Sequence, residues 1–463
     1  MTIVIWLAAL AILDQNTMEV VPPILVTGAL FFTFCIFLKC IVRTPLFGEI
    51  GFIYIGFVVA YTILPTVVFL KLNFDFPSGF DTLNFSVLDP SPEQIGRHLW
   101  RHNIFILSLV IGYLSLRGGV ASPVLGERFT IHNDKPTIVF LLSGILLCIV
   151  AISVFSAPVD DYYDHYTRFD HLSWVWRRIL YIFVIFKTGG YYVLFALMFR
   201  NYKEYKFLVF FLLIASVGYE IIYSYGSRIE ALSLLIGFAG FYHFKVKAID
   251  LKKGSLYLMT LVVFFTLVES YRAADFDFSL VVDQMVGKGL NIAYEFGSVF
   301  YTSFHLYSER LSGFMPQHDW LMFFGDFLNF IPFVDHTAFN SQYWYAQNYF
   351  PNAIVPPQTM GPLADSAIWG GEIDLFVRGL INGMLYALLA RWFYNRKNLI
   401  WPLVIYVYFY ATCIVALKYS VFFQLSALAR YVLPVIIISV IFKRSGDIFE
   451  RISDKKVQPT LRI

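Results

Sequence analysis

The chain has 463 residues, of which 58% are hydrophobic, 19% are aromatic and only 14% are charged, and its formal net charge is +3. Together with a mean hydropathy of +0.65, this composition indicates a polytopic membrane protein. It excludes a separate soluble domain and gives no basis for a nucleic-acid partner.

Apolar windows of about 17 to 25 residues predict twelve membrane-spanning helices in an all-α fold. The first window is short, and a signal peptide is the competing interpretation. No small-residue cleavage site follows Leu13, so we expect a helix there. The predicted spans cover residues 2–13, 20–42, 48–70, 103–116, 137–157, 178–199, 207–224, 229–244, 255–270, 373–392, 399–417 and 420–442.

The distribution of lysine and arginine predicts the orientation. Alternate loops and the segment after Phe442, which includes the C-terminal tail over residues 444–463, carry 21 of the 35 basic residues. By the positive-inside rule these segments and both termini face the cytoplasm. The four cysteines, Cys35, Cys40, Cys148 and Cys413, all fall within predicted spans, which excludes a disulfide framework.

The spans divide the chain into a helical part over 1–271, a large outer loop over 272–370 and three closing helices over 371–443. The loop is too aromatic for disorder and too long to be a simple connection. We expect short interfacial helices over 279–307 and 321–330, with an inert cap as the alternative.

An intramembrane arginine is the most informative single residue. Arg430 lies about ten residues into the last predicted span, roughly 15 Å deep at ~1.5 Å per residue. A guanidinium at that depth costs at least ~2.5 kcal/mol. We therefore expect a partner for Arg430, which is a carboxylate, a water-filled cavity or an anionic substrate.

Two further arginines are predicted at the outer level. Ser227 is a suitable N-cap for the helix that follows Arg228, and Gly226 allows a ligand to approach the backbone. Arg272 directly follows the next predicted span. Arg228, Arg272 and Arg430 together resemble a pyrophosphate clamp, because guanidinium groups bind phosphate oxygens bidentately.

Each cation also has an ordinary structural explanation. Arg228 and Arg272 can extend toward lipid headgroups. Arg378 has Asp374 one turn earlier and is expected to form a helix ion pair. Lys187 is expected to pair with Glu220 on the following helix, ahead of a role in substrate binding.

Proton transfer would need a base, and Glu295 and His336 in the outer loop are the candidates, with Asp326, Asp335 and Asp365 behind them. The acidic cluster from Asp160 to His171 matches no particular metal cage and is better explained as a solvated loop. We therefore expect neither a metal nor another cofactor.

Four stretches resemble the Wzy-type O-antigen and enterobacterial-common-antigen polymerases, which are glycosyltransferases of the GT-C class. They are Leu88 to Glu93, Tyr225 to Arg228, the outer-loop elements from Phe327 to Gly371, and Ala429 to Tyr431. The outer-loop elements include Phe339-Asn340-Ser341 and Pro357-Gln358-Thr359-Met360-Gly361-Pro362. Their order along the chain matches the order in that family.

The resemblance implies a GT-C-like fold and a multi-pass protein of the bacterial inner membrane with its active site facing the periplasm. It implies a polymerase of lipopolysaccharide biosynthesis that transfers the growing glycan from one polyprenyl-pyrophosphate carrier, such as undecaprenyl pyrophosphate, onto a new repeat unit. Donor and acceptor are then lipid-linked glycans, and a polysaccharide chain-length regulator is a possible partner beside the membrane lipids.

The resemblance also implies site roles. Arg228 and Arg272 would hold the pyrophosphate, and Arg430 would stabilise charge on the leaving group. Glu295 and His336 remain the candidate bases. Asn340, Tyr343, Thr359 and Asp365 are assigned to sugar binding, although aromatic residues in this loop also suit a membrane-interface belt.

Three other functions share parts of this pattern. An O-antigen ligase would use the same architecture and arginines to pass glycan to lipid A core. A GT-C enzyme with a monosaccharide-phosphate donor would place acidic residues in the first outer loop, and Asp14 and Glu19 fit that pattern loosely. A lipid-linked oligosaccharide flippase would use intramembrane charges such as Lys187 and Glu220, but we find no internal repeat of the kind expected for one.

Overall fold

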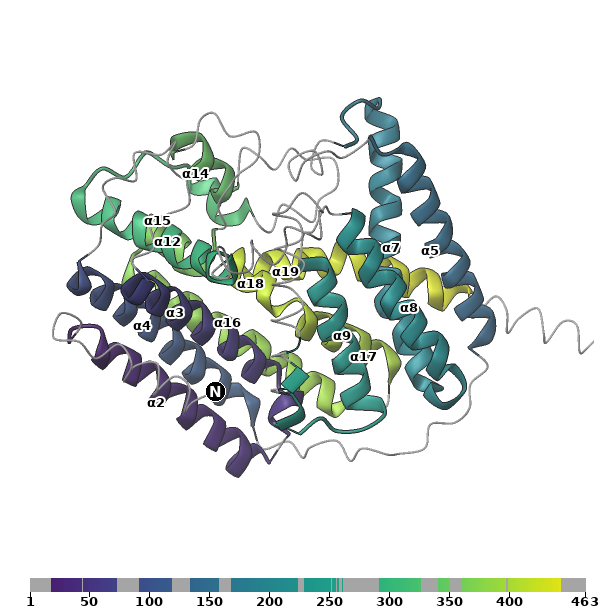
Figure 1. Cartoon of the computed structure of the whole chain (residues 1–463), viewed down its shortest axis with the longest axis horizontal. Helices are drawn as coiled ribbons and strands as arrows, with labels where there is room; N and C mark the ends of the chain where they lie inside the picture. Colours follow the sequence, from purple (N-terminus) through teal and green to yellow (C-terminus); the bar gives the residue numbers. More distant parts are fainter. Residues whose placement is uncertain are drawn as a thin grey trace, which may run out of the picture.

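The fold is described from a computed structural model, shown in Figure 1. The structure describes twelve stretches of the chain and one isolated residue. Within these stretches, the side chains of residues 67–72, Ile229, residues 291–298 and Phe324 are not described. The described residues are 18–43, 45–72, 91–118, 134–157, 168–223, 229–250, 252–254, 256–257, 260, 291–325, 340–349, 360–396 and 399–442.

All regular secondary structure in these residues is helical. Seven helices are long and apolar enough to cross a membrane, judged by length and composition. The helices are α2 Val21–Phe37 with its π-helical extension Leu38–Val42, α3 Ile50–Leu72, α4 Pro92–Arg117, α5 Lys135–Phe155, α7 Trp174–Arg200, α8 Tyr202–Tyr223, α9 Ile229–Lys245, α12 Asn291–Ser312, α14 Ser341–Tyr349, α15 Pro362–Trp369, α16 Glu372–Asn395, α17 Ile400–Ala411, α18 Cys413–Lys418 and α19 Val421–Ala427. A π turn, Leu428–Val432, continues α19 into a helix that ends at Phe442.

Two groups of helices build the molecule. Helices α2, α3, α4 and α16 pack side by side, and α4 and α16 form the most extensive helix pair. Helices α5, α7, α8, α9 and α17 form the second group, joined by the helix that runs from α19 through the π turn, which crosses the middle of Figure 1. Helices α12, α14 and α15 lie together at one end of the first group.

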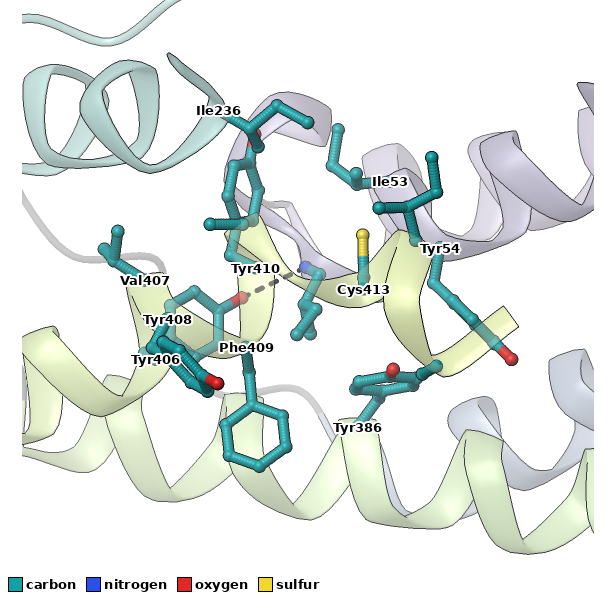
Figure 2. Close-up of a cluster of buried hydrophobic side chains, with 14 of the residues drawn as sticks. Ile53, Tyr54, Ile236, Tyr386, Tyr406, Val407, Tyr408, Phe409, Tyr410 and Cys413 are labelled. Carbon is teal, nitrogen blue, oxygen red and sulfur yellow. Dashed lines mark hydrogen bonds between the residues drawn. The ribbon is translucent and has the colours of Figure 1, made fainter. Parts of the chain in front are cut away.

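A tyrosine-rich core joins the two groups. Figure 2 shows Tyr54 of α3 and Tyr386 of α16 beside Cys413 of α18, and their ring centroids are 4.8 Å apart. The hydroxyl of Tyr406 donates to the carbonyl oxygen of Gly48 at 2.8 Å, and that of Tyr410 donates to the carbonyl oxygen of Phe47 at 2.7 Å. These hydrogen bonds attach α17 to the start of α3, so the core is specified by polar contacts as well as by apolar packing.

A fully buried ion pair lies near this core. The guanidinium of Arg117 donates to both carboxylate oxygens of Glu49, at 3.0 and 2.7 Å, and neither side chain is exposed. The Tyr113 hydroxyl donates to the same carboxylate at 2.5 Å, and the ring of Tyr394 lies 4.6 Å from the guanidinium. Arg117 belongs to one of the basic loops that the positive-inside rule assigns to the cytoplasm, whereas the structure places its side chain inside the helix bundle with Glu49 as its partner.

Two histidines of α4 connect helix α12 to the first group of helices. The Thr62 and Ser303 hydroxyls each donate to a backbone carbonyl four residues earlier, at 2.8 Å, so both accept from a histidine ring. His102 Nδ1 therefore donates to Thr62 at 2.8 Å, and His98 Nε2 donates to Ser303 at 3.0 Å. The two Nε2 atoms lie 3.2 Å apart, so the polar contacts run without a break from Thr62 of α3 to Ser303 of α12.

Helices α12 and α14 are joined by a polar contact of their own. His305 Nδ1 of α12 and the hydroxyl of Tyr345 of α14 are 3.0 Å apart, and Tyr345 is 1% exposed. Burial lowers the pKa of His305 to about 4. The contact holds α14, which carries the predicted sugar-binding residue Tyr343, against α12.

Several predicted elements differ from the structure. The fourth helix begins at Pro92 rather than at residue 103, because Ser91 and Gln94 form a capping box ahead of its amphipathic first turns. The predicted span 399–417 is broken at Thr412 into α17 and α18. The interfacial helix predicted over 279–307 is seen as α12 and ends five residues later, while the described part of the predicted 321–330 helix overlaps the short 3-10 helix Trp320–Phe324.

The predicted spans over 2–13 and most of 255–270 lie outside the described residues. The described part of the chain contains seven membrane-spanning candidates. The total of twelve spans and the GT-C-like fold remain predictions.

Candidate functional site

Most of the predicted catalytic and pyrophosphate-binding residues lie outside the described residues. These are Arg228, Arg272 and His336, together with the side chain of Glu295, whose backbone belongs to α12; the predicted sugar-binding residue Thr359 also lies outside the described residues. Their roles remain predictions. The described members of the predicted site are Arg430, Asn340, Tyr343 and Asp365.

The three loop residues occupy different settings. Asn340 precedes α14, and its side-chain oxygen accepts from the backbone N–H of Gln342 at 2.8 Å, which satisfies a free donor at the helix start. Tyr343 is 36% exposed. Asp365 is 5% exposed and lies 3.5 Å from Arg378, so its carboxylate already has a protein cation as partner.

The expected pair of Arg378 and Asp374 is confirmed, with 2.5 Å between Nε and Oδ2. Arg378 therefore lies between two carboxylates of the α15–α16 corner. Its role is adequately explained by these contacts.

A chamber of about 470 Å³ lies between α7, α8, α9 and the broken helices α17 to α19. Its wall is rich in tyrosine, and it also contains two cationic and two acidic side chains. The lining includes Arg168, Tyr181, Lys187, Tyr192, Glu220, Tyr223, Glu230, Ser233, Leu234, Thr412, Gln424 and Tyr431.

Irregular backbone forms one side of the chamber. Helix α17 ends at Ala411 and α18 at Lys418, and α19 restarts with Ser420 as its N-cap, whose hydroxyl accepts from Phe423 N at 3.0 Å. The fully buried Gln424 donates to the carbonyl oxygen of Phe409 at 2.9 Å and to the Thr412 hydroxyl at 2.8 Å. Broken helices at membrane depth are tolerated where the protein or a cavity satisfies the freed polar groups, as here.

Arg430 lies beside this chamber on the π turn. Its Nη1 donates to the hydroxyl of Tyr181 at 2.8 Å, and that hydroxyl lies 3.4 Å from the hydroxyl of Tyr431. Both tyrosines line the chamber. The guanidinium makes no ion pair with any carboxylate of the described residues, so the partner that its depth requires is a hydroxyl within that part of the chain.

Close packing fixes the π turn against α7. A Cβ atom on Gly189 would lie only 1.8 Å from the carbonyl oxygen of Tyr431, so the position requires glycine. Single π turns inside α-helices frequently occur at functional sites. Here the turn sets the direction from which Arg430 reaches Tyr181.

Lys187 and Glu220 form the expected ion pair, with 2.7 Å between Nζ and Oε1 and side chains 2% and 5% exposed. The ammonium also lies 4.9 Å and 4.7 Å from the ring centroids of Tyr219 and Tyr223. A charged pair with so little water contact depends on these added interactions. The prediction that Lys187 pairs with Glu220 is confirmed.

Arg168 and Glu230 are chamber residues that the sequence analysis missed. The Arg168 guanidinium lies 3.7 Å from the Tyr223 ring centroid and donates to the Tyr223 carbonyl oxygen at 2.7 Å. Glu230 is exposed in the first turn of α9. With Arg430 included, the described chamber residues carry three cations and two carboxylates, which favours an anionic ligand.

The acidic cluster near Arg168 is only partly described. Asp170, one of its members, forms an ion pair with Arg177 at 3.0 Å. Within the described residues, no group of three His, Cys, Asp or Glu side chains is arranged to hold a metal ion.

An apolar pocket, also of about 470 Å³, lies on the other side of α19, against α16 and α17. Its lining includes Tyr386, Phe409, Leu425 and Leu428. The Tyr386 hydroxyl donates to Gln424 at 2.8 Å, so this hydrogen bond separates the apolar pocket from the polar chamber. The two pockets together offer neighbouring sites for a lipid chain and for a polar group.

The outer-loop motif ends next to the chamber wall. A Cβ atom on Gly361 would lie 2.0 Å from the carbonyl oxygen of Leu417, at the break between α18 and α19. Close packing therefore explains the glycine at position 361 of the Pro357 to Pro362 element in this chain.

The chain was compared with protein-family models, with curated proteins and with solved structures, and it matches none of them.

Proposed function

We propose that this protein is a glycosyltransferase of the bacterial inner membrane that polymerises polyprenyl-pyrophosphate-linked oligosaccharides into an O-antigen-type polysaccharide. The growing chain is transferred as a block from one lipid carrier to the terminal sugar of the next repeat unit. The reaction takes place on the periplasmic side, and both chain termini lie in the cytoplasm.

The observation that carries the proposal is the setting of Arg430. An intramembrane guanidinium is held by a tyrosine hydroxyl beside an aromatic chamber, and no described carboxylate neutralises it. A diphosphate leaving group has the charge and the oxygen geometry that such a cation binds. Arg228, which directly precedes α9, would bring a second guanidinium to the same group.

The two pockets support an amphipathic substrate. The chamber has aromatic rings for the apolar faces of sugars, two cations and two carboxylates in its wall, and Arg430 beside it as a third cation. The neighbouring pocket has an almost entirely apolar wall, which suits part of a polyprenyl chain. Free sugars or free nucleotides would leave this second pocket unused.

The chemical task for the protein is limited, because the diphosphate ester already activates the sugar. The anomeric C–O bond breaks with its electron pair leaving on the diphosphate, while an acceptor hydroxyl forms the new C–O bond. The protein must align the two glycans, stabilise the leaving diphosphate and accept the hydroxyl proton. No cofactor is required by this scheme.

The test uses the full chain purified in detergent, with a polyprenyl-pyrophosphate-linked repeat unit as its only glycan substrate and EDTA present. Wild type is expected to produce a ladder of polymers on a gel. Arg430→Ala is expected to lower turnover by about 100-fold or more, the range found for loss of one group that stabilises developing charge. Arg97→Ala is the matched control, since Arg97 is exposed and its ion pair within the described residues is with Glu93 in its own helix.

Other outcomes point to the other functions. Transfer of glycan to a lipid A core acceptor without polymer formation would identify a ligase. Movement of the lipid-linked glycan across a vesicle bilayer, with neither transfer reaction, would identify a flippase and overturn the enzyme proposal.

A further inference from the structure

We propose that Glu230 is the general base of the chamber, the carboxylate that accepts the proton of the attacking sugar hydroxyl. This inference rests on the proposed function, and it assigns a role that the sequence analysis gave to Glu295 or His336. The starting point is that two carboxylates, Glu220 from α8 and Glu230 from α9, line the described part of the chamber.

Glu220 is already committed to another charge. Its Oε1 lies 2.7 Å from Lys187 Nζ, and the residue is 4% exposed. Proton uptake by Glu220 would leave the Lys187 ammonium buried without its counter-ion, which is costly. Glu220 therefore suits the maintenance of charge balance in the chamber wall.

Glu230 differs from Glu220 in its access to water. It lies in the first turn of α9, and Ser233 and Leu234, three and four residues later, also line the chamber. This spacing places Glu230 on the chamber side of α9. The residue is nevertheless exposed, so its carboxylate can take a proton from the chamber and release it to bulk water.

The contrast between the two carboxylates follows a general pattern in acid–base catalysis. Where two carboxyl groups share a site, different environments separate their roles. Here Glu220 is enclosed in the chamber wall, whereas the side chain of Glu230 is exposed. The proposed step moves the acceptor hydroxyl proton to a Glu230 oxygen as the hydroxyl oxygen bonds to the anomeric carbon and the diphosphate departs with the electron pair.

Glu230 also has an ordinary structural explanation. An acidic residue in the first turn of a helix stabilises the helix through its dipole. That role predicts a change in stability when the charge is removed, with no selective effect on turnover. The catalytic role predicts a selective loss of turnover and a change in the pH dependence of the rate.

The experiment compares full-length Glu230→Gln, Glu230→Asp and Glu220→Gln in the detergent polymerisation assay. Glu204→Gln is the control, because Glu204 is an exposed acidic residue in the first turn of α8 and pairs with Lys135. We expect Glu230→Gln to lower kcat by about 100-fold or more, with KM and thermal stability unchanged. We expect Glu230→Asp to restore part of kcat, and the acid limb of the wild-type pH–rate profile to be absent in Glu230→Gln.

The outcomes separate this inference from the function on which it rests. If wild type forms no polymer, the proposed function fails. If wild type and Glu230→Gln polymerise equally, the assignment of Glu230 fails and the function stands. A selective loss of kcat in a folded Glu220→Gln variant, without one in Glu230→Gln, would transfer the role to Glu220 and overturn the proposal.

Discussion

Two buried ion pairs in this protein have the same chemistry and different surroundings. Glu49 and Arg117 form two hydrogen bonds, receive a third from Tyr113 and are completely buried. Lys187 and Glu220 are joined by one contact and border a chamber of about 470 Å³. Burial of charge alone therefore does not indicate function. The more enclosed Glu49–Arg117 pair has a structural explanation, whereas the Lys187–Glu220 pair borders a space that a ligand can occupy.

The largest expected effect is on the enclosed pair. Arg117→Met leaves the Glu49 carboxylate buried without a counter-charge and should destabilise the protein by about 3–5 kcal/mol. We expect the variant to lose its folded fraction in fluorescence-detected size-exclusion chromatography. The exposed variant Arg97→Ala should behave as wild type, and a folded, stable Arg117→Met would show that the two pairs do not differ in the way described.

Lys187→Met sharpens the same comparison at the chamber. Glu220 loses its partner, but neighbouring chamber space can admit water, so the cost should be smaller, about 1–3 kcal/mol. Thermal unfolding in detergent measures the difference. The double variant Lys187→Met/Glu220→Leu should recover most of the loss, and a double variant less stable than Lys187→Met would contradict this account.

His305 extends the comparison to a buried group that carries no charge. Burial lowers its pKa to about 4 from an ordinary value of 6.5, so the unfolded chain binds a proton at higher pH than the folded protein does. Its contribution to stability is therefore present above pH 6.5 and is lost as the pH falls toward 4. Between pH 7.5 and pH 5 we expect a loss of about 2 kcal/mol.

The measurement is the thermal unfolding midpoint of wild type and His305→Gln across this pH range. The variant keeps a hydrogen-bonding side chain opposite Tyr345 but cannot titrate there. Its midpoint should vary less with pH than that of wild type. Equal pH dependence in the two proteins would exclude His305 as the source.

The smallest expected effect concerns the hydroxyl that holds Arg430. Tyr181→Phe removes one charge-assisted hydrogen bond at 2.8 Å and should lower kcat/KM by roughly tenfold, equivalent to about 1.4 kcal/mol, with little change in stability. Tyr192→Phe is the control, since Tyr192 also lines the chamber and has no hydrogen bond to Arg430. Equal polymerisation rates in both variants would show that Tyr181 does not position the guanidinium.

The sequence predicted the membrane class, most helix positions and three polar features. Arg430, the Lys187–Glu220 pair and the Arg378–Asp374 pair were recognised because a charge in an apolar run, or one turn from its opposite, has few physical explanations. The start of α4 was missed because its first two turns are amphipathic and fall below an apolar window. The break at Thr412 was missed because its sequence remains apolar throughout.

The chamber itself was not predictable from local patterns. Arg168 lies outside the helices and meets Tyr223 only through the folding of α7 against α8. Glu230 has the appearance of a standard first-turn acidic residue until α7 and α8 are placed beside it. Such sites arise from tertiary placement, and a single sequence contains no direct signal of it.

The π turn at Leu428–Val432 fixes the rotational phase between the two halves of one long helix. Before it, α19 presents Gln424 to the chamber and Leu425 to the apolar pocket. After it, the helix follows α7 past Gly189 and ends with the ring of Phe442 stacked on Phe140 at 4.4 Å. A π turn takes up one residue more than an α-helical turn while the flanking segments keep nearly the same phase, so deleting one residue there would convert it to an α-helical turn and change which side chain of the turn faces Tyr181. The two halves would keep their partners, and the direction of the Arg430 guanidinium would be lost, so the extra residue of the turn serves the placement of Arg430.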